Sequence, residues 1–253
     1  MNPVTGAQLW SLRNVLLKEP EATLEKLAAA GYSVVEPAGF NIQEGTIQGF
    51  TPLLLKSLAN SNGLQIPSAH FQFSIEEAAK VGECAASMGI KYIVRSFFSN
   101  ELEQTQDAYK RAAEALNHMG ATANTFGVQL AYHNHAHEFE MVDGVSLFDI
   151  LLMYTDPELV IFQPDLGWLN LAGQDPVAIF KRFPGRFPLW HFRDIDAETK
   201  RSTAIGNGMV DFTPAIANQS LAGLEYAIVE MASDTEDPLG KILSSQKTIE
   251  RLF

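Results

Sequence analysis

The strongest constraint on the fold is a regular alternation of β-rich runs and amphipathic helical stretches along the whole 253-residue chain. We count eight such pairs, with no linker, charge block or low-complexity insert between them. The β-rich runs are mostly apolar and rich in β-branched or aromatic residues, which is typical of parallel strands covered on both faces. The expected strands are Val4–Leu12, Ser33–Gly39, Leu64–Phe73, Lys91–Phe98, Val128–His135, Val160–Trp168, Phe187–Ile195 and Glu225–Met231.

The stretches between these strands carry helix signals. Proline falls at several expected first turns, and glycine follows several expected last turns. The expected helices are Glu21–Ala30, Pro52–Ser61, Ile75–Met88, Gln104–Thr125, Leu147–Tyr154, Pro176–Phe183, Pro214–Leu221 and Pro238–Leu252. Eight strand–helix pairs in about 250 residues predict a (β/α)8 TIM barrel that forms a single domain over residues 1–253. No GxGxxG motif follows the first strand, which disfavours an open dinucleotide-binding sheet.

Composition narrows the range of partners. The formal net charge of -12 disfavours binding to nucleic acid or to an anionic membrane surface. No apolar run approaches the roughly 18 residues of a membrane span, and the N-terminus lacks the pattern of a secretion signal. The single cysteine, Cys84, cannot form an intrachain disulfide. We therefore expect a cytoplasmic protein, monomeric or homo-oligomeric, whose partner is a small molecule.

Polar residues gather at the expected C-terminal ends of the strands, where barrel enzymes carry their active sites. Four of the six histidines are among them: His70, His133, His135 and His191. Carboxylates end further strands, at Glu36, Asp165 and Glu230. Acids at the ends of buried apolar strands are uncommon unless their charges are paired or bind a metal.

Four of these side chains come from strands five to eight and could surround one ion: His133, Asp165, His191 and Glu230. Imidazole and carboxylate ligands without thiolates suit Mn²⁺, Co²⁺ or Zn²⁺, with Mg²⁺ the least suited. An ion pair of Asp165 and Glu230 with Arg193 or Arg95 is the alternative interpretation.

Other residues are candidates for substrate contacts. Trp168 could form an apolar wall against a sugar ring or pack in the core. The glycines of GNGMVDF, which flank Asn207, permit close backbone approach to a ligand, although such loops are common. His137 and Glu138, just beyond the fifth strand, could support the site residues or lie in a solvated loop, and the solvated position is favoured.

Several segments occur in the same order as in a known family: LAYHNHAHEF, FQPDLGWLNLAGQDP, PLWHFRDI, AIGNGMVDF and EYAIVEMASDTEDPL. On these segments the chain resembles the sugar phosphate isomerase/epimerase family of the xylose isomerase-like barrel superfamily. The resemblance implies one divalent cation at the ends of strands five to eight, held by His133, Asp165, His191 and Glu230. Many members end the fifth strand with a Glu that is both ligand and base. This chain has His133 and His135 there, so either histidine could be the ligand.

The leading hypothesis from the sequence is a sugar isomerase or epimerase that transfers a proton next to a carbonyl through a metal-stabilised enediolate. Glu230 would bind the ion and accept a proton, with His135 or Glu36 as the second acid or base. Arg193 would hold a substrate oxygen, and His70, Trp168 and Asn207 would contact the substrate. The alternatives are a lyase, either a dehydratase or an enzyme that cleaves 3-keto-glycosides, and a non-catalytic sugar-binding barrel.

Overall fold

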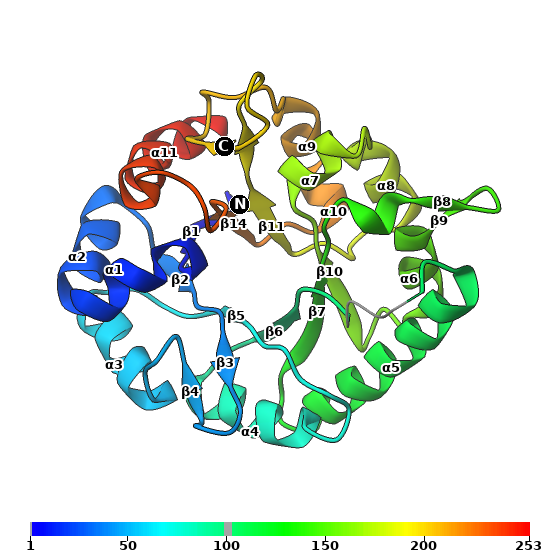
Figure 1. Ribbon diagram of the computed structural model, residues 1–253, viewed down its shortest axis with the longest axis horizontal. Coiled ribbons are helices and arrows are strands. Elements are labelled where there is room, and N and C mark those ends of the chain that lie inside the picture. The colour runs from blue at the N-terminus through cyan, green and yellow to red at the C-terminus, as the bar shows by residue number, and fades with distance from the viewer. Residues whose placement is uncertain (1, 99–102) are drawn as a thin grey trace.

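The computed structural model describes residues 2–98 and 103–253, and its strands form a ring that helices surround (Figure 1). Two parallel four-stranded sheets, in the orders β11-β14-β1-β2 and β10-β7-β6-β5, make up the ring. Bridges from Val34 to Gln65 and from Asp165 to His191 join the two sheets. The strands are β1 (Val4–Gln8), β2 (Val34–Glu36), β5 (Ser68–His70), β6 (Tyr92–Arg95), β7 (Gln129–His133), β10 (Val160–Gln163), β11 (Leu189–Phe192) and β14 (Tyr226–Val229). The predicted TIM barrel is confirmed.

The helices pack outside the ring and alternate with its strands. They are α2 (Pro20–Ala30), α3 (Pro52–Ser61), α4 (Ala78–Met88), α5 (Gln106–Asn124), α6 (Leu147–Tyr154), α8 (Pro176–Arg182), α9 (Thr213–Ala217), α10 (Gln219–Ala222) and α11 (Pro238–Leu252). The single helix expected over Pro214–Leu221 is wrong, because the chain breaks at Asn218 into α9 and α10. Among the described residues, no helix has the length and apolar character needed to cross a membrane.

Several strands are shorter than expected because the chain turns into a helix at the barrel mouth. The first expected strand runs into η1 (Trp10–Leu12) and α1 (Arg13–Lys18). The sixth ends before α7 (Leu166–Leu171), whose first turn is capped by the side chain of Asp165. The structure also has short elements in the loops, which were not predicted except for β12, whose residues fall within the expected seventh strand. They are the pairs β3 (Phe40–Asn41) with β4 (Thr46–Ile47), β8 (Met141–Val142) with β9 (Val145–Ser146), and β12 (Asp194–Ile195) with β13 (Ser202–Thr203), and the turn η2 (His137–Phe139).

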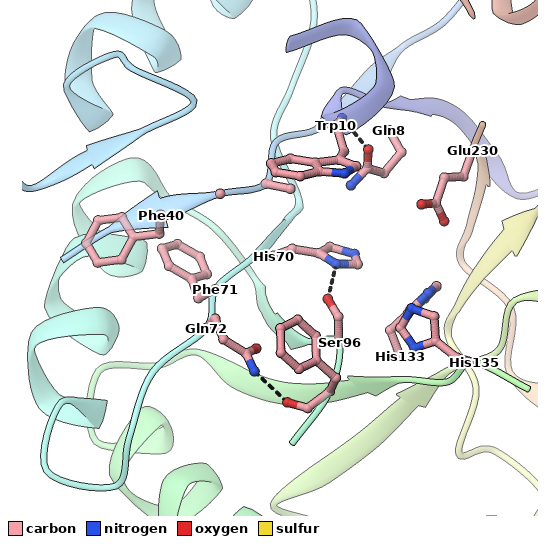
Figure 2. Close-up of a pocket in the computed structure, with 13 residues that line it drawn as sticks. Gln8, Trp10, Phe40, His70, Phe71, Gln72, Ser96, His133, His135 and Glu230 are labelled. Carbon is pink, nitrogen blue, oxygen red and sulfur yellow. Dashed lines mark hydrogen bonds between the residues drawn. The ribbon is translucent and has the colours of Figure 1, made fainter. Parts of the chain in front are cut away.

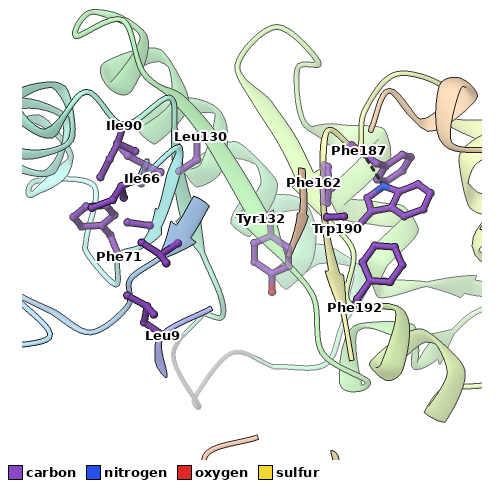
Figure 3. Packing of buried hydrophobic residues seen from close by; sticks show 14 of the residues in the cluster. Leu9, Ile66, Phe71, Ile90, Leu130, Tyr132, Phe162, Phe187, Trp190 and Phe192 are labelled. Carbon is purple, nitrogen blue, oxygen red and sulfur yellow. Dashed lines mark hydrogen bonds between the residues drawn. The ribbon is translucent and has the colours of Figure 1, made fainter. Parts of the chain in front are cut away.

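The hydrophobic core has two parts. A small cluster fills the barrel interior and consists of Tyr92, Val94, Ala131, Ile161, Leu189 and Ile228. A much larger cluster lies between the strands and the helices, and Figure 3 shows part of it, including the rings of Phe187, Trp190 and Phe192. Interior filling of this kind makes the barrel a packed scaffold, so a ligand can bind only beyond the ends of the strands.

Close packing of α5 against the chain entering β10 gives a stability prediction. A Cβ added at Gly120 would lie 2.7 Å from the carbonyl oxygen of Leu159, which is backbone and cannot rotate away. We expect Gly120→Ala to lower the free energy of unfolding by about 1–3 kcal/mol because of this overlap. Urea denaturation would measure the change. The exposed His118 on the same helix is a matched site, and His118→Ala should stay within about 0.5 kcal/mol of the parent.

Candidate active site

The site side chains continue the inward-facing rows of the barrel strands. Alternate residues of a strand share one face, so the position two residues beyond an interior residue also points inward. Ala131, Leu189 and Ile228 belong to the interior cluster. The next inward positions on the same strands are His133, His191 and Glu230. On β10, the same two-residue spacing leads from Ile161 to Gln163 and then to Asp165, which follows the strand.

The four side chains expected to bind a metal are brought together. One ligand atom from each of His133, Asp165, His191 and Glu230 lies within 4.8 Å of every other. All four residues are buried, and Nδ1 of His133 has no hydrogen-bond partner among the described residues. A buried imidazole nitrogen without a partner costs free energy that an ion could recover. The donor set therefore fits a divalent cation.

His191 lies between two carboxylates. Its Nε2 is 2.6 Å from Oε1 of Glu36, and its Nδ1 is 2.5 Å from Oε2 of Glu230. Burial disfavours the imidazolium, but the two carboxylates outweigh burial and raise the pKa of His191 to about 10. Burial likewise opposes ionisation of Glu230, yet Arg193 and His191 hold its pKa well below the usual value.

Arg193 joins the two acids of the cluster. Its Nε donates to Oδ2 of Asp165 at 2.7 Å, and its Nη2 is 2.8 Å from Oε2 of Glu230. Nη1 donates to Ser202 Oγ at 3.1 Å, and the guanidinium carbon lies 5.4 Å from the centre of the Trp168 ring. The ion pair that the sequence offered as an alternative is thus present, and it coexists with the ligand cluster.

Glu36 lies at the bottom of the site. Its Oε2 accepts hydrogen bonds from Ser68 Oγ at 2.5 Å and from Gln163 Nε2 at 2.8 Å. Its Oε1 lies 2.8 Å from Nε2 of His70 and faces His191. Glu36 is fully buried, and its pKa is well below the usual value because the two histidines outweigh the cost of burial. Both of its oxygens are engaged, so this carboxylate orients the rings above it.

A cavity of about 390 Å³ opens above these residues (Figure 2). The predicted site residues that line it are His70, His133, His135 and Glu230. Those that do not line it are Glu36, Asp165, Trp168, His191, Arg193 and Asn207. Asn207 is exposed and does not line the cavity. Its loop is fixed by Asp194, whose carboxylate accepts hydrogen bonds from the N–H groups of Gly206, Gly208 and Val210.

His133 and His135 share the cavity wall but differ in surroundings. Burial is the main cause that lowers the pKa of each imidazole, so both are neutral near pH 7. The His135 ring lies 5.8 Å from the Trp168 ring, and its Nδ1 is buried without a hydrogen-bond partner among the described residues. Both histidines can therefore offer a lone pair, to a metal or to a proton.

Sequence reasoning missed residues that hold this wall. Glu138 is buried, which contradicts the expected solvated loop position, whereas His137 is exposed. Glu138 accepts hydrogen bonds from the Tyr132 hydroxyl and from the backbone N–H of His135, each at 2.8 Å. The supporting residues Ser68 and Gln163 were also missed. Ser68 lies two residues before His70, and Gln163 lies two residues before Asp165. Because alternate residues of a strand face the same side, this spacing could have identified both as neighbours of the site.

The family follows from comparison with known proteins. A family model described as xylose isomerase-like TIM barrel matches residues 24–251. The chain belongs to the xylose isomerase-like TIM barrel family. It is similar to an inosose dehydratase of Lacticaseibacillus casei, with 29% identity over 277 aligned positions that cover 91% of this chain and 88% of that protein.

Solved structures share the fold of this chain. A sugar phosphate isomerase/epimerase from Parabacteroides distasonis superposes with a TM-score of 0.86 at 24% identity, over 99% of this chain and 94% of that one. The IOLI protein, described with a bound zinc atom, superposes with a TM-score of 0.77 at 15% identity, over 98% and 97% of the two chains. At these identities the likeness concerns the fold alone.

Proposed function

We propose that this protein is a divalent-metal-dependent lyase, which acts on a sugar or cyclic polyol that carries a ketone. The reaction would expel an oxygen leaving group, water or an alcohol, from the second carbon away from the ketone. The observation that carries the proposal is the buried set His133, Asp165, His191 and Glu230, whose ligand atoms lie within 4.8 Å of one another beside the cavity. The similarity to an inosose dehydratase supports elimination over isomerisation.

The isomerase or epimerase favoured by the sequence becomes the second choice. Glu230 is the one carboxylate among the described residues that line the cavity. In a two-carboxylate epimerisation, one carboxylate removes a proton from one face of the substrate and a second carboxylate returns a proton to the other face. That second carboxylate is lacking here, because Glu36 is buried with both oxygens engaged. Elimination needs one group that moves a proton, and His135 supplies it.

The proposed steps assign one role to each group. His133, Asp165, His191 and Glu230 would hold the metal, which when bound would supply Lewis-acid stabilisation of the charge that develops on the ketone oxygen. Neutral His135 accepts the proton from the carbon next to the ketone, and the electron pair of that C–H bond forms a C=C bond. The adjacent C–O bond breaks, and His135 returns the proton to the departing oxygen. Glu230 is a poor acceptor because Arg193 and His191 hold its pKa low.

Product analysis tests the proposal. The protein loaded with Mn²⁺, Co²⁺ or Zn²⁺ is incubated with inosose and with 3-keto-glucosides, and the products are examined by mass spectrometry. We expect products that have lost water or the aglycone, and we expect a chelator to remove the activity. Products of unchanged mass would instead establish an isomerase. Binding of both probes by the metal-loaded protein without turnover would establish a sugar-binding barrel.

The two histidines of β7 are expected to separate ion binding from proton transfer. We expect His133→Ala to lose bound metal, because it removes an imidazole from the ligand set. We expect His135→Ala to retain the metal while its turnover falls by about 10² to 10⁴-fold, the usual contribution of a general base. Metal content by elemental analysis and turnover on the same samples would measure both effects. Loss of metal from His135→Ala would reverse the assignment, and His118→Ala should change neither quantity.

A further inference from the structure

The cavity has two chemically different ends. His133, His135 and Glu230 lie together at one end, with His70 between this group and the rest of the cavity (Figure 2). Phe40 and Phe71 lie at the opposite end, and Trp10 lies beside Gln8 between the two ends (Figure 2). Phe97 also lines the cavity. A volume of about 390 Å³ falls within the range of roughly 300–1,000 Å³ that accommodates drug-sized ligands, which exceed a single sugar ring.

The aromatic end is assembled from separate segments of the chain. Phe71 is buried in the core and packs edge to face against Phe40, with ring centres 5.1 Å apart. Trp10 and Phe97 are 39% and 42% exposed, so their rings keep apolar surface available at the cavity. Aromatic side chains that keep exposed surface at a cavity gain most from covering an apolar, planar group.

In the part of the chain that the structure describes, the aromatic end of the cavity offers no cationic side chain to an anionic group. No lysine or arginine is among the described residues that line the cavity, and Glu230 contributes a negative charge. Arg193 is buried against Asp165 and Glu230 and does not line the cavity. Residues 99–102, outside the described ranges, contain no lysine or arginine in their sequence. A phosphate group placed at the aromatic end, away from the metal cluster, would therefore lose its water without gaining a cationic partner.

We propose that the aromatic end is a binding subsite for an apolar ring, and that the natural substrate is an uncharged glycoside whose aglycone is that ring. This inference rests on the proposed function for the sugar half, which reacts at the end lined by His133, His135 and Glu230. The ring half would be contacted by Trp10, Phe40 and Phe97, with Phe71 packed against Phe40. It goes further than the proposed function because it selects ring-bearing, uncharged sugars over free cyclic polyols and over sugar phosphates.

Unreactive ligands test the subsite independently of turnover. Phenyl β-glucoside and methyl β-glucoside differ in the ring alone, and calorimetry with the metal-loaded protein would compare their affinities, with both α-anomers measured alongside. We expect a phenyl glucoside to bind at least about tenfold more tightly than its methyl counterpart, as stacking on aromatic side chains provides. Glucose 6-phosphate is expected to bind no better than glucose.

Substitutions locate the effect. Phe97→Ala and Trp10→Ala should each remove most of the phenyl preference while leaving the affinity for the methyl glucoside within about twofold. Tyr154→Ala, at an exposed aromatic residue that does not line the cavity, should preserve the preference. Equal affinity for phenyl and methyl glucosides of both anomers, or a preference that survives both cavity variants, would overturn the subsite. Failure of inosose and 3-keto-glucosides to undergo elimination would instead overturn the proposed function and leave the binding result standing.

Discussion

Replacing Glu230 by glutamine is expected to abolish metal binding and turnover together. The amide keeps the shape of the side chain but removes the negative charge that faces Arg193 and His191. Arg193 then keeps only Asp165 as a carboxylate partner and His191 keeps only Glu36, so a divalent ion meets stronger repulsion and has one ligand fewer. Because the ion contributes several kcal/mol to stabilising developing charge, we expect turnover to fall by about 10³-fold or more. Elemental analysis and initial rates measure the two effects.

Glu225 provides the matched control because it flanks the same strand, β14. It precedes β14 at the opposite end of the barrel, where its carboxylate lies 2.6 Å from Nζ of Lys91 and is 44% exposed. Glu225→Gln therefore breaks a solvent-exposed ion pair, which contributes at most about 1 kcal/mol to stability, and leaves the metal cluster untouched. We expect unchanged metal content and turnover. A Glu230→Gln protein that is folded and still binds one ion per chain would remove the basis of the proposed chemistry.

The sequence predicted the ligand cluster because its members obey two local rules. Each residue lies at the end of a predicted strand, and the parallel strands of a barrel bring such ends to one rim. His133 and Glu230 also continue inward-facing rows that begin at Ala131 and Ile228. These rules need no knowledge of long-range contacts, so a single sequence was enough to bring together the candidates that the structure places within 4.8 Å, while the choice between His133 and His135 stayed open.

The role of Glu36 could not be inferred in the same way. Its partner His191 lies 155 positions further along the chain, on β11, whereas Glu36 ends β2. These are the two edge strands of one sheet, so the contact exists because that sheet curls into the ring. Arg193 shows a related difficulty, since an arginine beside a cavity can face the substrate or the acids. The choice depends on side-chain directions, and Gly167 helps here because its missing Cβ leaves room for the Arg193 side chain packed against it.

Fold prediction succeeded where the chain carries explicit stop and start residues. Helices α3 and α11 begin at Pro52 and Pro238, and their predicted and observed bounds agree. The expected helix after Pro214 lacked such a signal for its interruption. Asn218 ends α9 with its own side chain, which donates to the carbonyl oxygen of Pro214 at 2.9 Å. A competing side-chain hydrogen bond of this kind is an individual contact that helical periodicity does not reveal.

Metal affinity is expected to rise about tenfold per pH unit between roughly pH 6.5 and 10. In the metal-free protein the pKa of His191 is about 10, so its imidazole carries a proton that an incoming ion must displace. His133, whose pKa lies well below the ordinary value, is already neutral in this range. Glu36 and Glu230 are already ionised there. One proton should therefore be released per ion bound, which calorimetry in buffers of different ionisation enthalpy measures directly.

The stability of the metal-free protein should change with pH in the opposite sense. The folded pKa of His191 is raised above its unfolded value of about 6.5, so its stabilising contribution is fully present below that pH and is lost as the pH rises through 10.

Glu36→Gln removes one of the two carboxylates that raise the pKa of His191, so proton release on metal binding should decline at a lower pH in the variant than in the parent. An identical pH dependence of metal binding in parent and variant would show that the displaced proton does not come from a His191 held by Glu36.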